Sequence, residues 1–215
     1  MRLLRKIQNH FQEKRVFKIV LPHTLVGTQR VRNLYGLAQR IEEEKIPGDV
    51  VECGVYNGGT AAVLARTASH SQLGRTVWLF DSFQGMPQTT ERDGVQAQEY
   101  VGKVLGSPEQ VQELLRKVGA DLNRVKIIKG FFEDSFPKVQ IPQIALFNID
   151  ADWYESVKLC LEKFYDSVVQ NGFIAIDDYG HWPGCRQAVD EFFKSRGLSY
   201  ELREVDYTAR WFQKT

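Results

Sequence analysis

Two short apolar runs in the second half of the chain each end in a pair of acidic residues. The run FNI is followed by Asp150 and Asp152, and the run AI is followed by Asp177 and Asp178. Buried parallel strands have this continuous apolar character. Ligands of open α/β sheets bind at the carboxyl ends of such strands. Because a stretch with helical periodicity separates the two runs, we expect consecutive strands of one βαβ unit, with their acids at one edge of the sheet.

Carboxylates gathered in this way repel one another unless a proton or a cation holds them together. A set of oxygen ligands suits a hard divalent ion such as Mg²⁺. Asp is also common at helix N-caps, which would explain one acid after a strand. Two pairs after two strands fit that explanation poorly, so the pattern favours a metal site built from three or four of these acids.

A glycine-rich loop follows the first predicted strand, Val50–Val55, in the sequence VVECGVYNGGT. Gly54, Gly58 and Gly59 let the backbone turn tightly and approach a ligand closely. Their spacing differs from the G-x-G-x-x-G of dinucleotide-binding proteins. Glu52 would repel a phosphate but would suit a cationic ligand such as S-adenosylmethionine (SAM). A strand-turn-helix joint without a ligand is the alternative interpretation of the glycines alone.

The next two strand ends extend this candidate cofactor site. Asp81, in LFDSFQGMP, lies about 20 to 30 residues after the glycine loop, near the position where an acid grips ribose hydroxyls. The third strand ends in KGFFEDSFP, where Phe131 and Phe132 could form a wall of an adenine pocket or belong to the core.

From Val50 onward the chain alternates strands and helices, which is typical of a parallel sheet. The expected strands are Val50–Val55, Thr76–Asp81, Val125–Lys129, Ile144–Ile149 and Gly172–Ile176, and the expected helices include Gly59–Ser69, Pro108–Val118, Tyr154–Val169 and Gly184–Arg196. Two last strands, Tyr200–Val205 and Ala209–Gln213, are joined by a link too short for a parallel crossover, so we expect an antiparallel hairpin at the sheet edge. The sequence therefore predicts an α/β fold with a mostly parallel, seven-stranded Rossmann-like sheet.

The N-terminal region has a different character. Met1–Lys18 carries six basic residues and one acid, with apolar residues at helical spacing, so we expect an amphipathic basic helix. Such a helix packs on its own domain or on a second subunit, which makes a homodimer conceivable; contact with an anionic membrane is the less favoured alternative. Pro22–Gly27 is expected to be a loop and Thr28–Lys45 a helix.

The composition excludes several classes of partner. A net charge of +1 over 215 residues gives no support for a nucleic-acid partner. No apolar run approaches the ~20 residues of a membrane span, and no secretory signal is visible. Three cysteines, Cys53, Cys160 and Cys185, are an odd number, which favours reduced thiols and a cytoplasmic setting. We interpret all three as small buried apolar residues.

Six blocks of the sequence occur in order in one known family. IPGD, VECGVYNGGT, FDSFQGMP, GFFEDSFP, IDADWYES and IDDYGHWPGCRQAVDEF resemble the macrocin O-methyltransferase family, and the resemblance runs from about Leu21 to the C-terminus. It implies a class I methyltransferase fold and SAM- and Mg²⁺-dependent methylation of a small-molecule hydroxyl, on a sugar of a glycosylated natural product. It also implies a lid, His23–Gly27, so we divide the chain into an N-terminal helical arm and lid, 1–47, and a methyltransferase domain, 48–215.

The resemblance also suggests roles for individual residues. Asp150, Asp177 and Asp178 match the metal ligands, and Asp152 matches a candidate base; we assign Asp150 and Asp152 to catalysis. We expect the cofactor to be bound by Glu52, Gly54, Tyr56, Gly58, Asp81, Ser82, Phe132, Glu133 and Asp150. The segment Gln88–Ser107 is less similar to the family and lies where an acceptor would be selected.

Chemistry explains why these parts belong together, and it leaves alternatives. An alcohol is a poor nucleophile, whereas a metal acidifies and orients a hydroxyl and a nearby carboxylate takes its proton. His181 is a second candidate for the base, while Cys185 has no adjacent base and is set aside as a nucleophile. A metal-independent SAM methyltransferase, a nucleotide-dependent oxidoreductase and a SAM- or metal-binding regulatory module are the other functions considered.

Overall fold

The structure, a computed structural model of the chain, describes residues 14–215. Residues 14–20 are helical, and the remainder of the basic helix predicted over Met1–Lys18 falls on residues that lie outside the described part. No helix among the described residues is long and apolar enough to cross a membrane.

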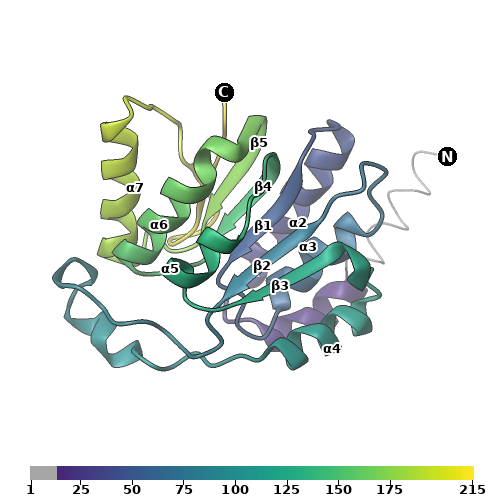
Figure 1. The fold of residues 1–215 in the computed structure, drawn as a ribbon, viewed down its shortest axis with the longest axis horizontal. Helices are drawn as coiled ribbons and strands as arrows, with labels where there is room; N and C mark the ends of the chain where they lie inside the picture. The colour runs from purple at the N-terminus through teal and green to yellow at the C-terminus, as the bar shows by residue number, and fades with distance from the viewer. Residues whose placement is uncertain (1–13) are drawn as a thin grey trace.

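The centre of the molecule is a seven-stranded sheet with the strand order β3-β2-β1-β4-β5-β7-β6 (Figure 1). The strands are β1 Asp49–Cys53, β2 Val77–Asp81, β3 Val125–Lys129, β4 Ile144–Ile149, β5 Val168–Ile176, β6 Arg203–Glu204 and β7 Arg210–Gln213. The first five are parallel, and β7 runs antiparallel to both β5 and β6. The predicted mostly parallel sheet with a C-terminal antiparallel hairpin is confirmed.

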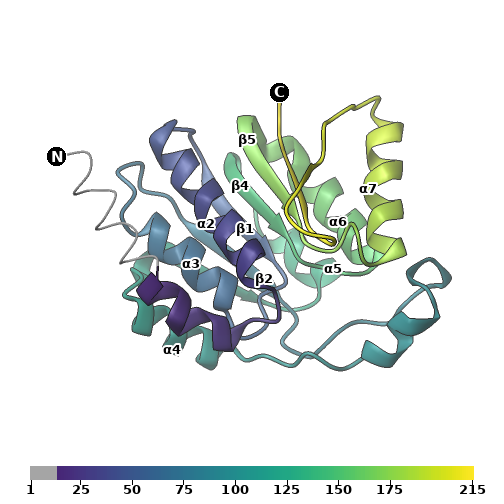
Figure 2. The same ribbon diagram turned by 180° about the vertical axis from the view of Figure 1, so that it is seen from behind.

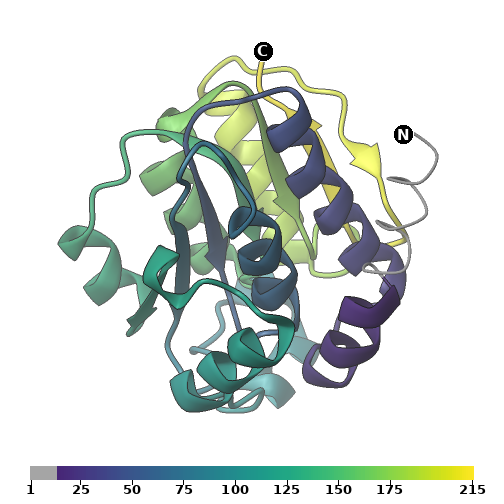
Figure 3. The same cartoon turned by 90° about the vertical axis from the view of Figure 1, so that its right-hand side faces the viewer.

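Helices cover both faces of this sheet. They are α2 Thr28–Glu43, α3 Gly59–Ala68, α4 Pro108–Val118, α5 Phe132–Ser135, α6 Tyr154–Phe164 and α7 Pro183–Ser195. The first three lie in front of the sheet in Figure 2, and the last three lie in front of it in Figure 1. Figure 3, turned by 90°, shows the sheet between the two helical layers.

Each strand contributes side chains to two apolar cores, because successive residues of a strand point to opposite faces. In β2, Val77 and Leu79 belong to the core under α2, α3 and α4, whereas Trp78 and Phe80 pack in the core under α5, α6 and α7. Burial on both faces explains why the central strands are continuous apolar runs in the sequence.

The fifth strand differs from its prediction. The helix α6 ends at Phe164 instead of Val169, and β5 begins at Val168 instead of Gly172. The Asn-Gly pair that suggested a boundary lies inside the strand, where Asn171 has a φ of +66°. A Cβ at Gly172 would lie 2.8 Å from a methyl group of Val168, so glycine is needed at this irregularity. The hairpin strand β6 is also shorter than predicted.

A buried arginine fixes the connection from α2 to β1. The guanidinium of Arg75 donates to the backbone carbonyls of Ile41, Ile46 and Gly48 and pairs with Glu42. Carbonyl groups after a helix lack intrahelical partners, and a cation there also interacts favourably with the helix dipole. The C-terminal end of α2 is therefore held against the sheet, which positions the opposite end of this helix near the carboxyl ends of the strands.

Candidate active site

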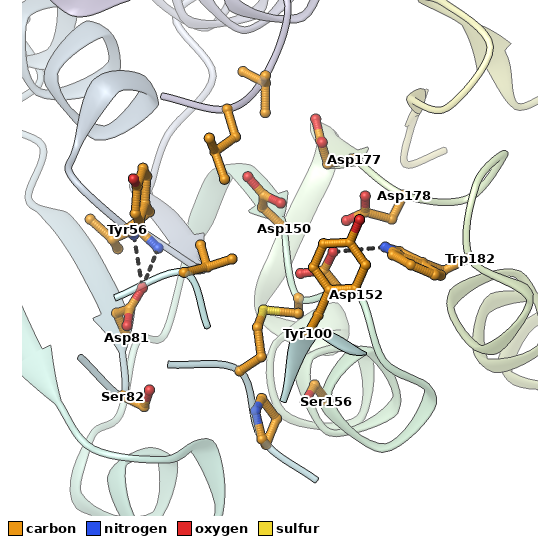
Figure 4. Close-up of a pocket in the computed structure, with 18 of the residues that line it drawn as sticks. Tyr56, Asp81, Ser82, Tyr100, Asp150, Asp152, Ser156, Asp177, Asp178 and Trp182 are labelled. Carbon is orange, nitrogen blue, oxygen red and sulfur yellow. Dashed lines mark hydrogen bonds between the residues drawn. The ribbon is translucent and has the colours of Figure 1, made fainter. Parts of the chain in front are cut away.

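A cavity of about 400 Å³ opens at the carboxyl ends of β1, β2, β4 and β5. In Figure 4 the glycine loop, with Tyr56 and Asp81, lies on one side of this cavity, and Asp150, Asp177 and Asp178 lie on the other. Two of the three candidate sites in the sequence, the glycine loop and the acidic pairs, therefore share one cavity, as ligand sites of open α/β sheets do.

Close approach of two strand ends makes glycine necessary in the loop after β1. Gly54 has a φ of +88°, and a Cβ at this position would lie 1.7 Å from the carbonyl oxygen of Asp150. Gly58, with a φ of +86°, is the N-cap of α3. Any side chain at Gly54 would push β4 away, so this glycine determines the distance between the loop and the acids.

Asp81 organises the same loop. One of its oxygens, Oδ2, accepts hydrogen bonds from the backbone N–H groups of Val55 at 2.7 Å and Tyr56 at 2.8 Å. The other, Oδ1, accepts from the N–H of Phe83 at 2.7 Å. A carboxylate oxygen has two lone pairs, so Oδ1 keeps the capacity to accept from a ribose hydroxyl. Asp81 and the adjacent Ser82 both line the cavity, and their contact with SAM stays a prediction.

Glu52 lies beneath the loop and does not line the cavity. Its side chain is fully buried and accepts a hydrogen bond from the amide of Asn148 at 2.9 Å. Burial raises the pKa of this carboxyl to about 8. Its second oxygen, Oε2, has no hydrogen-bond partner among the described residues. The prediction that Glu52 contacts the cofactor stays untested, and the structure gives this acid a position one layer below the cavity surface.

Aromatic residues form the wall next to Asp81. Phe131, Phe132 and Glu133 line the cavity at the start of α5. The ring of Phe132 stacks on Phe136 with 4.7 Å between the ring centroids, and Phe136 packs in turn on Phe80 of the core. The Phe132 ring therefore belongs to both the cavity wall and the core, the two alternatives that the sequence left open.

The acids after β4 and β5 come together. Asp150, Asp177 and Asp178 each offer an oxygen within 4.8 Å of the oxygens of the other two. The buried Oδ2 of Asp178 has no hydrogen-bond partner in the described part of the chain. A buried polar atom without a partner is costly, and a cation would satisfy it. The donor set and this atom fit a hard divalent cation.

Burial and mutual repulsion oppose ionisation of these carboxyls. Burial raises the pKa of Asp150 and of Asp178 well above the usual range, and the neighbouring carboxylates raise both pKa values further. Burial also raises the pKa of Asp177 to about 6 and that of Asp152 to about 7. Without a cation, the cluster therefore keeps protons at neutral pH.

These raised pKa values predict how stability depends on pH. The folded protein holds protons that the unfolded chain, with Asp pKa values near 3.8, has released. Stability from this source is complete below that value and is lost as the pH rises through about 6 to 7. We expect Asp178→Asn to raise the melting temperature relative to wild type by about 5 °C at pH 8 and by much less at pH 5 in EDTA.

Excess Mg²⁺ provides the matched condition for this thermal measurement. Metal ligands must be deprotonated, so the cation should stabilise the wild type increasingly as the pH rises and leave Asp178→Asn nearly unaffected. Equal melting-temperature differences at pH 5 and pH 8 would contradict the prediction.

Asp152 adopts an uncommon backbone conformation at the edge of this cluster. Its φ is +53°, in the left-handed region that Asp and Asn tolerate better than most residues. Its Oδ1 accepts a hydrogen bond from the indole N–H of Trp182 at 3.0 Å, the pair drawn in Figure 4. Strained conformations of this kind concentrate at functional sites. Trp182, which sequence analysis did not single out, orients the candidate base.

Arg30 is a second residue that sequence analysis missed. Its guanidinium pairs with Asp177, and its Nε lies 3.2 Å from Oδ2 of Asp206 in the terminal hairpin. Arg30 lies in the first turn of α2, immediately after the predicted lid, and is 147 residues from Asp177 in the chain. No local pattern could have indicated this contact, because it depends on how α2 packs across the sheet.

The predicted lid and the second candidate base also reach the cavity. Thr24, Leu25 and Val26 line it, and a Cβ at Gly59 would lie 2.6 Å from Cβ of Thr24, so the segment packs closely on the start of α3. His181 lines the opposite side, with Nδ1 at 3.3 Å from the hydroxyl of Tyr207. His181 therefore stays an alternative to Asp152.

Comparison with known proteins agrees with this geometry. A model of the family described as Macrocin-O-methyltransferase (TylF) matches residues 8–214. Demethyldecarbamoylnovobiocin O-methyltransferase of Streptomyces niveus is 34% identical over 200 residues, which are 90% of this chain and 76% of that protein. Mycinamicin III 3''-O-methyltransferase of Micromonospora griseorubida is 31% identical over 202 residues, which are 90% of this chain and 79% of that protein.

Solved structures agree as well. The O-methyltransferase NovP has a TM-score of 0.79 at 29% identity, covering 90% of this chain and 82% of that one. The calicheamicin methyltransferase CalS11 has a TM-score of 0.71 at 18% identity, covering 96% and 92%, which shows the shared fold. The sheet order and the cavity at its carboxyl edge thus define a class I, SAM-type methyltransferase. The chain belongs to the macrocin O-methyltransferase family.

Proposed function

We propose that this protein is a SAM- and Mg²⁺-dependent O-methyltransferase that acts on a sugar hydroxyl of an uncharged glycoside. The observation that carries the proposal is the placement of the glycine loop and the three clustered aspartates on two sides of one cavity. A methyl donor on the loop and an acceptor beside the aspartates would then meet inside the same cavity, where proximity and orientation accelerate transfer.

Each group would have a distinct role. SAM supplies an activated methyl group, and Asp81 and the loop of Gly54 and Gly58 would hold it. Asp150, Asp177 and Asp178 would hold Mg²⁺, which supplies Lewis acidity toward the acceptor hydroxyl. Asp152 would remove the hydroxyl proton as the methyl group transfers, because Trp182 holds it at the cluster and its pKa of about 7 suits a general base.

One observation favours a second candidate, a metal-independent methyltransferase. Arg30 already places a positive charge against Asp177. In that mechanism the guanidinium, and protons on the remaining acids, would balance the cluster. The effect of EDTA on turnover separates the two mechanisms.

The charge of the cavity favours an uncharged acceptor. Its lining includes six acids, which are Asp81, Glu133, Asp150, Asp152, Asp177 and Asp178. Among the described lining residues, Arg30 is the one arginine or lysine, and it is paired with Asp177 and Asp206. A diphosphate would meet repulsion and no free cation here. A sugar nucleotide is therefore a poor candidate, although the structurally similar CalS11 is described as a TDP-rhamnose 3'-O-methyltransferase.

Competing acceptors that share a sugar test this proposal. The panel pairs p-nitrophenyl α-L-rhamnopyranoside and p-nitrophenyl β-D-glucopyranoside with TDP-rhamnose and UDP-glucose, each assayed with labelled SAM and Mg²⁺. The relatives' names motivate the rhamnoside, since one relative from Streptomyces olivaceus methylates a rhamnosyl tetracenomycin. We expect labelled methyl transfer to a neutral glycoside. Transfer to the sugar nucleotides alone would reject the uncharged acceptor.

The cofactor assignment makes a separate prediction. Asp81→Ala removes a carboxylate that orders the loop and has capacity for a ribose hydroxyl. Loss of a charged hydrogen bond should weaken SAM binding by about 10- to 150-fold in calorimetric titrations. Asp166→Ala, which changes an exposed acid outside the cavity lining, is the matched control. Unchanged SAM affinity in Asp81→Ala would remove Asp81 from the cofactor site.

A further inference from the structure

A long loop after β2, which we call the arm (residues 86–103), reaches across to the other half of the molecule. Its two ends pair, since the N–H of Gly102 donates to the carbonyl of Met86 at 3.0 Å and the N–H of Met86 donates to that of Lys103 at 2.9 Å. Figure 1 shows the arm extending below α6 and α7. A loop with closed ends and an ordered path is often functional.

A buried aspartate anchors the arm. Asp93 is 0% exposed, and its Oδ1 accepts a hydrogen bond from the N–H of Tyr154, the first residue of α6, at 2.7 Å. Its Oδ2 accepts from the N–H and the hydroxyl of Thr90 at 2.7 and 2.9 Å. A carboxylate is favoured at the N-terminus of a helix, so the anchor satisfies both the acid and the helix.

The start of α7 closes over the same aspartate. A Cβ at Gly184 would lie 2.0 Å from Oδ1 of Asp93, so the fit requires glycine there. Arg92 lies over the ring of Tyr154 at 4.0 Å from the centroid. The arm therefore has one defined position relative to α6 and α7, the helices that follow the two acidic strand ends.

This position brings Tyr100 of the arm into the cavity. Tyr100 lines the cavity, and its ring meets the ring of Trp182 edge-on with 5.6 Å between centroids. Figure 4 shows Tyr100 beside Trp182 and Asp152. Tyr100 is 43% exposed, and no hydrogen bond of its side chain is found within the described residues. An aromatic face free beside the candidate base can stack on the apolar C–H face of a sugar ring.

We propose that the arm is the element that binds the acceptor, with Tyr100 as a contact residue and Asp93 as the positioning residue that holds Tyr100 at the cavity. The inference rests on the proposed function for the nature of the acceptor. It assigns specificity to a segment that the SAM loop and the acidic cluster do not use.

Four variants test the proposal with p-nitrophenyl α-L-rhamnopyranoside as acceptor. Tyr100→Ala should raise the acceptor KM by about 10- to 100-fold, because an aromatic contact is lost. Tyr100→Phe, which keeps the ring, should behave like wild type. Asp93→Ala should also raise the acceptor KM, through the displaced arm. Glu99→Gln, an exposed change on the arm, is the matched control. SAM affinity, measured by calorimetry, should change less than about twofold in all four.

Hydrogen exchange provides a readout of the anchor that needs no turnover. Asp93→Ala should increase amide exchange across residues 88–101 and leave the rest of the chain as protected as in wild type, whereas Tyr100→Ala should leave exchange unchanged. Unaltered exchange in Asp93→Ala, or an unchanged acceptor KM in Tyr100→Ala, would overturn the inference. Equal losses of SAM and acceptor affinity would also overturn it, because the arm would then serve the cofactor.

Failure of the proposed function gives a different result. A wild-type enzyme that binds the rhamnoside without methylating it would overturn the proposed function alone, and calorimetric titration of the rhamnoside into Tyr100→Ala then decides the inference. A wild-type enzyme that binds none of the panel glycosides would overturn both.

Discussion

Chelation of divalent cations with EDTA is expected to abolish methyl transfer, and excess Mg²⁺ to restore it. Three buried carboxylates with oxygens within 4.8 Å of one another repel strongly when ionised, and one divalent cation offsets most of that repulsion. Asp177→Asn should lower metal affinity by about 100-fold or more while SAM affinity is largely kept, because cofactor and metal use different strand ends. Calorimetry with Mg²⁺ and with SAM measures both.

The controls separate loss of metal from loss of fold. Asp190→Asn changes an exposed acid of α7 outside the main cavity and should keep the wild-type metal affinity. Asp177→Asn also removes one of the two carboxylates that hold Arg30, so its melting temperature must be compared with that of wild type in EDTA. Full activity in EDTA would reject the metal mechanism and favour the metal-independent alternative, in which Arg30 balances the cluster.

The sequence predicted the parts of the site that lie on continuous strands. The strands β2, β3 and β4 were predicted within one residue of their bounds, because strands buried on both faces are continuous apolar runs. Asp150 and Asp177 follow such runs directly, so their meeting at one edge follows from the pairing of β4 with β5. The terminal hairpin was predicted because a short link excludes a parallel crossover.

Contacts between distant segments could not be predicted in this way. Trp182 donates to Asp152 across 30 residues, Asp93 accepts from Tyr154 across 61, and Arg30 reaches Asp177 across 147. Each contact depends on the packing of a loop or a helix end, and the residue types involved are equally common on exposed surfaces.

Glu52 illustrates a different limit of sequence analysis. An acid two residues before a glycine loop resembles a ligand-binding group, but helices cover both faces of β1, and the side chain is fully buried against Asn148. The sequence shows the type of residue and its strand, whereas the depth of the side chain below the cavity depends on the three-dimensional packing.

Arg30 connects the two halves of the site in a way that neither motif suggests. It follows the lid residues Thr24, Leu25 and Val26, and it pairs with acids from β5 and from the terminal hairpin. The division of the chain at residue 47 stays a proposal, but α2 packs its apolar face, including Val31, into the core over the sheet. The N-terminal region thus contributes a charged group to the cavity as well as a cover.

Replacement of Asp152 by Asn should reduce the rate of methyl transfer by about 10²- to 10⁴-fold while the metal still binds. Asn keeps the shape of the side chain and can still accept a hydrogen bond from Trp182 through its carbonyl oxygen, but it cannot take a proton. Because burial raises the pKa of Asp152 to about 7, the wild-type rate should fall as the pH drops below 7. The variant should lose this dependence.

Two further variants decide between Asp152 and its alternative. Trp182→Phe removes the indole N–H that donates to Asp152 and keeps an aromatic ring, so it should lower kcat moderately and raise the apparent pKa of the rate profile, since a donor to the carboxylate lowers that pKa. His181→Ala should leave the profile near that of wild type. If Asp152→Asn were fully active and His181→Ala lost the dependence on pH instead, proton removal would belong to His181. The left-handed backbone at Asp152 and its bond to Trp182 favour the first result, because both fix one carboxylate orientation at the edge of the acidic cluster.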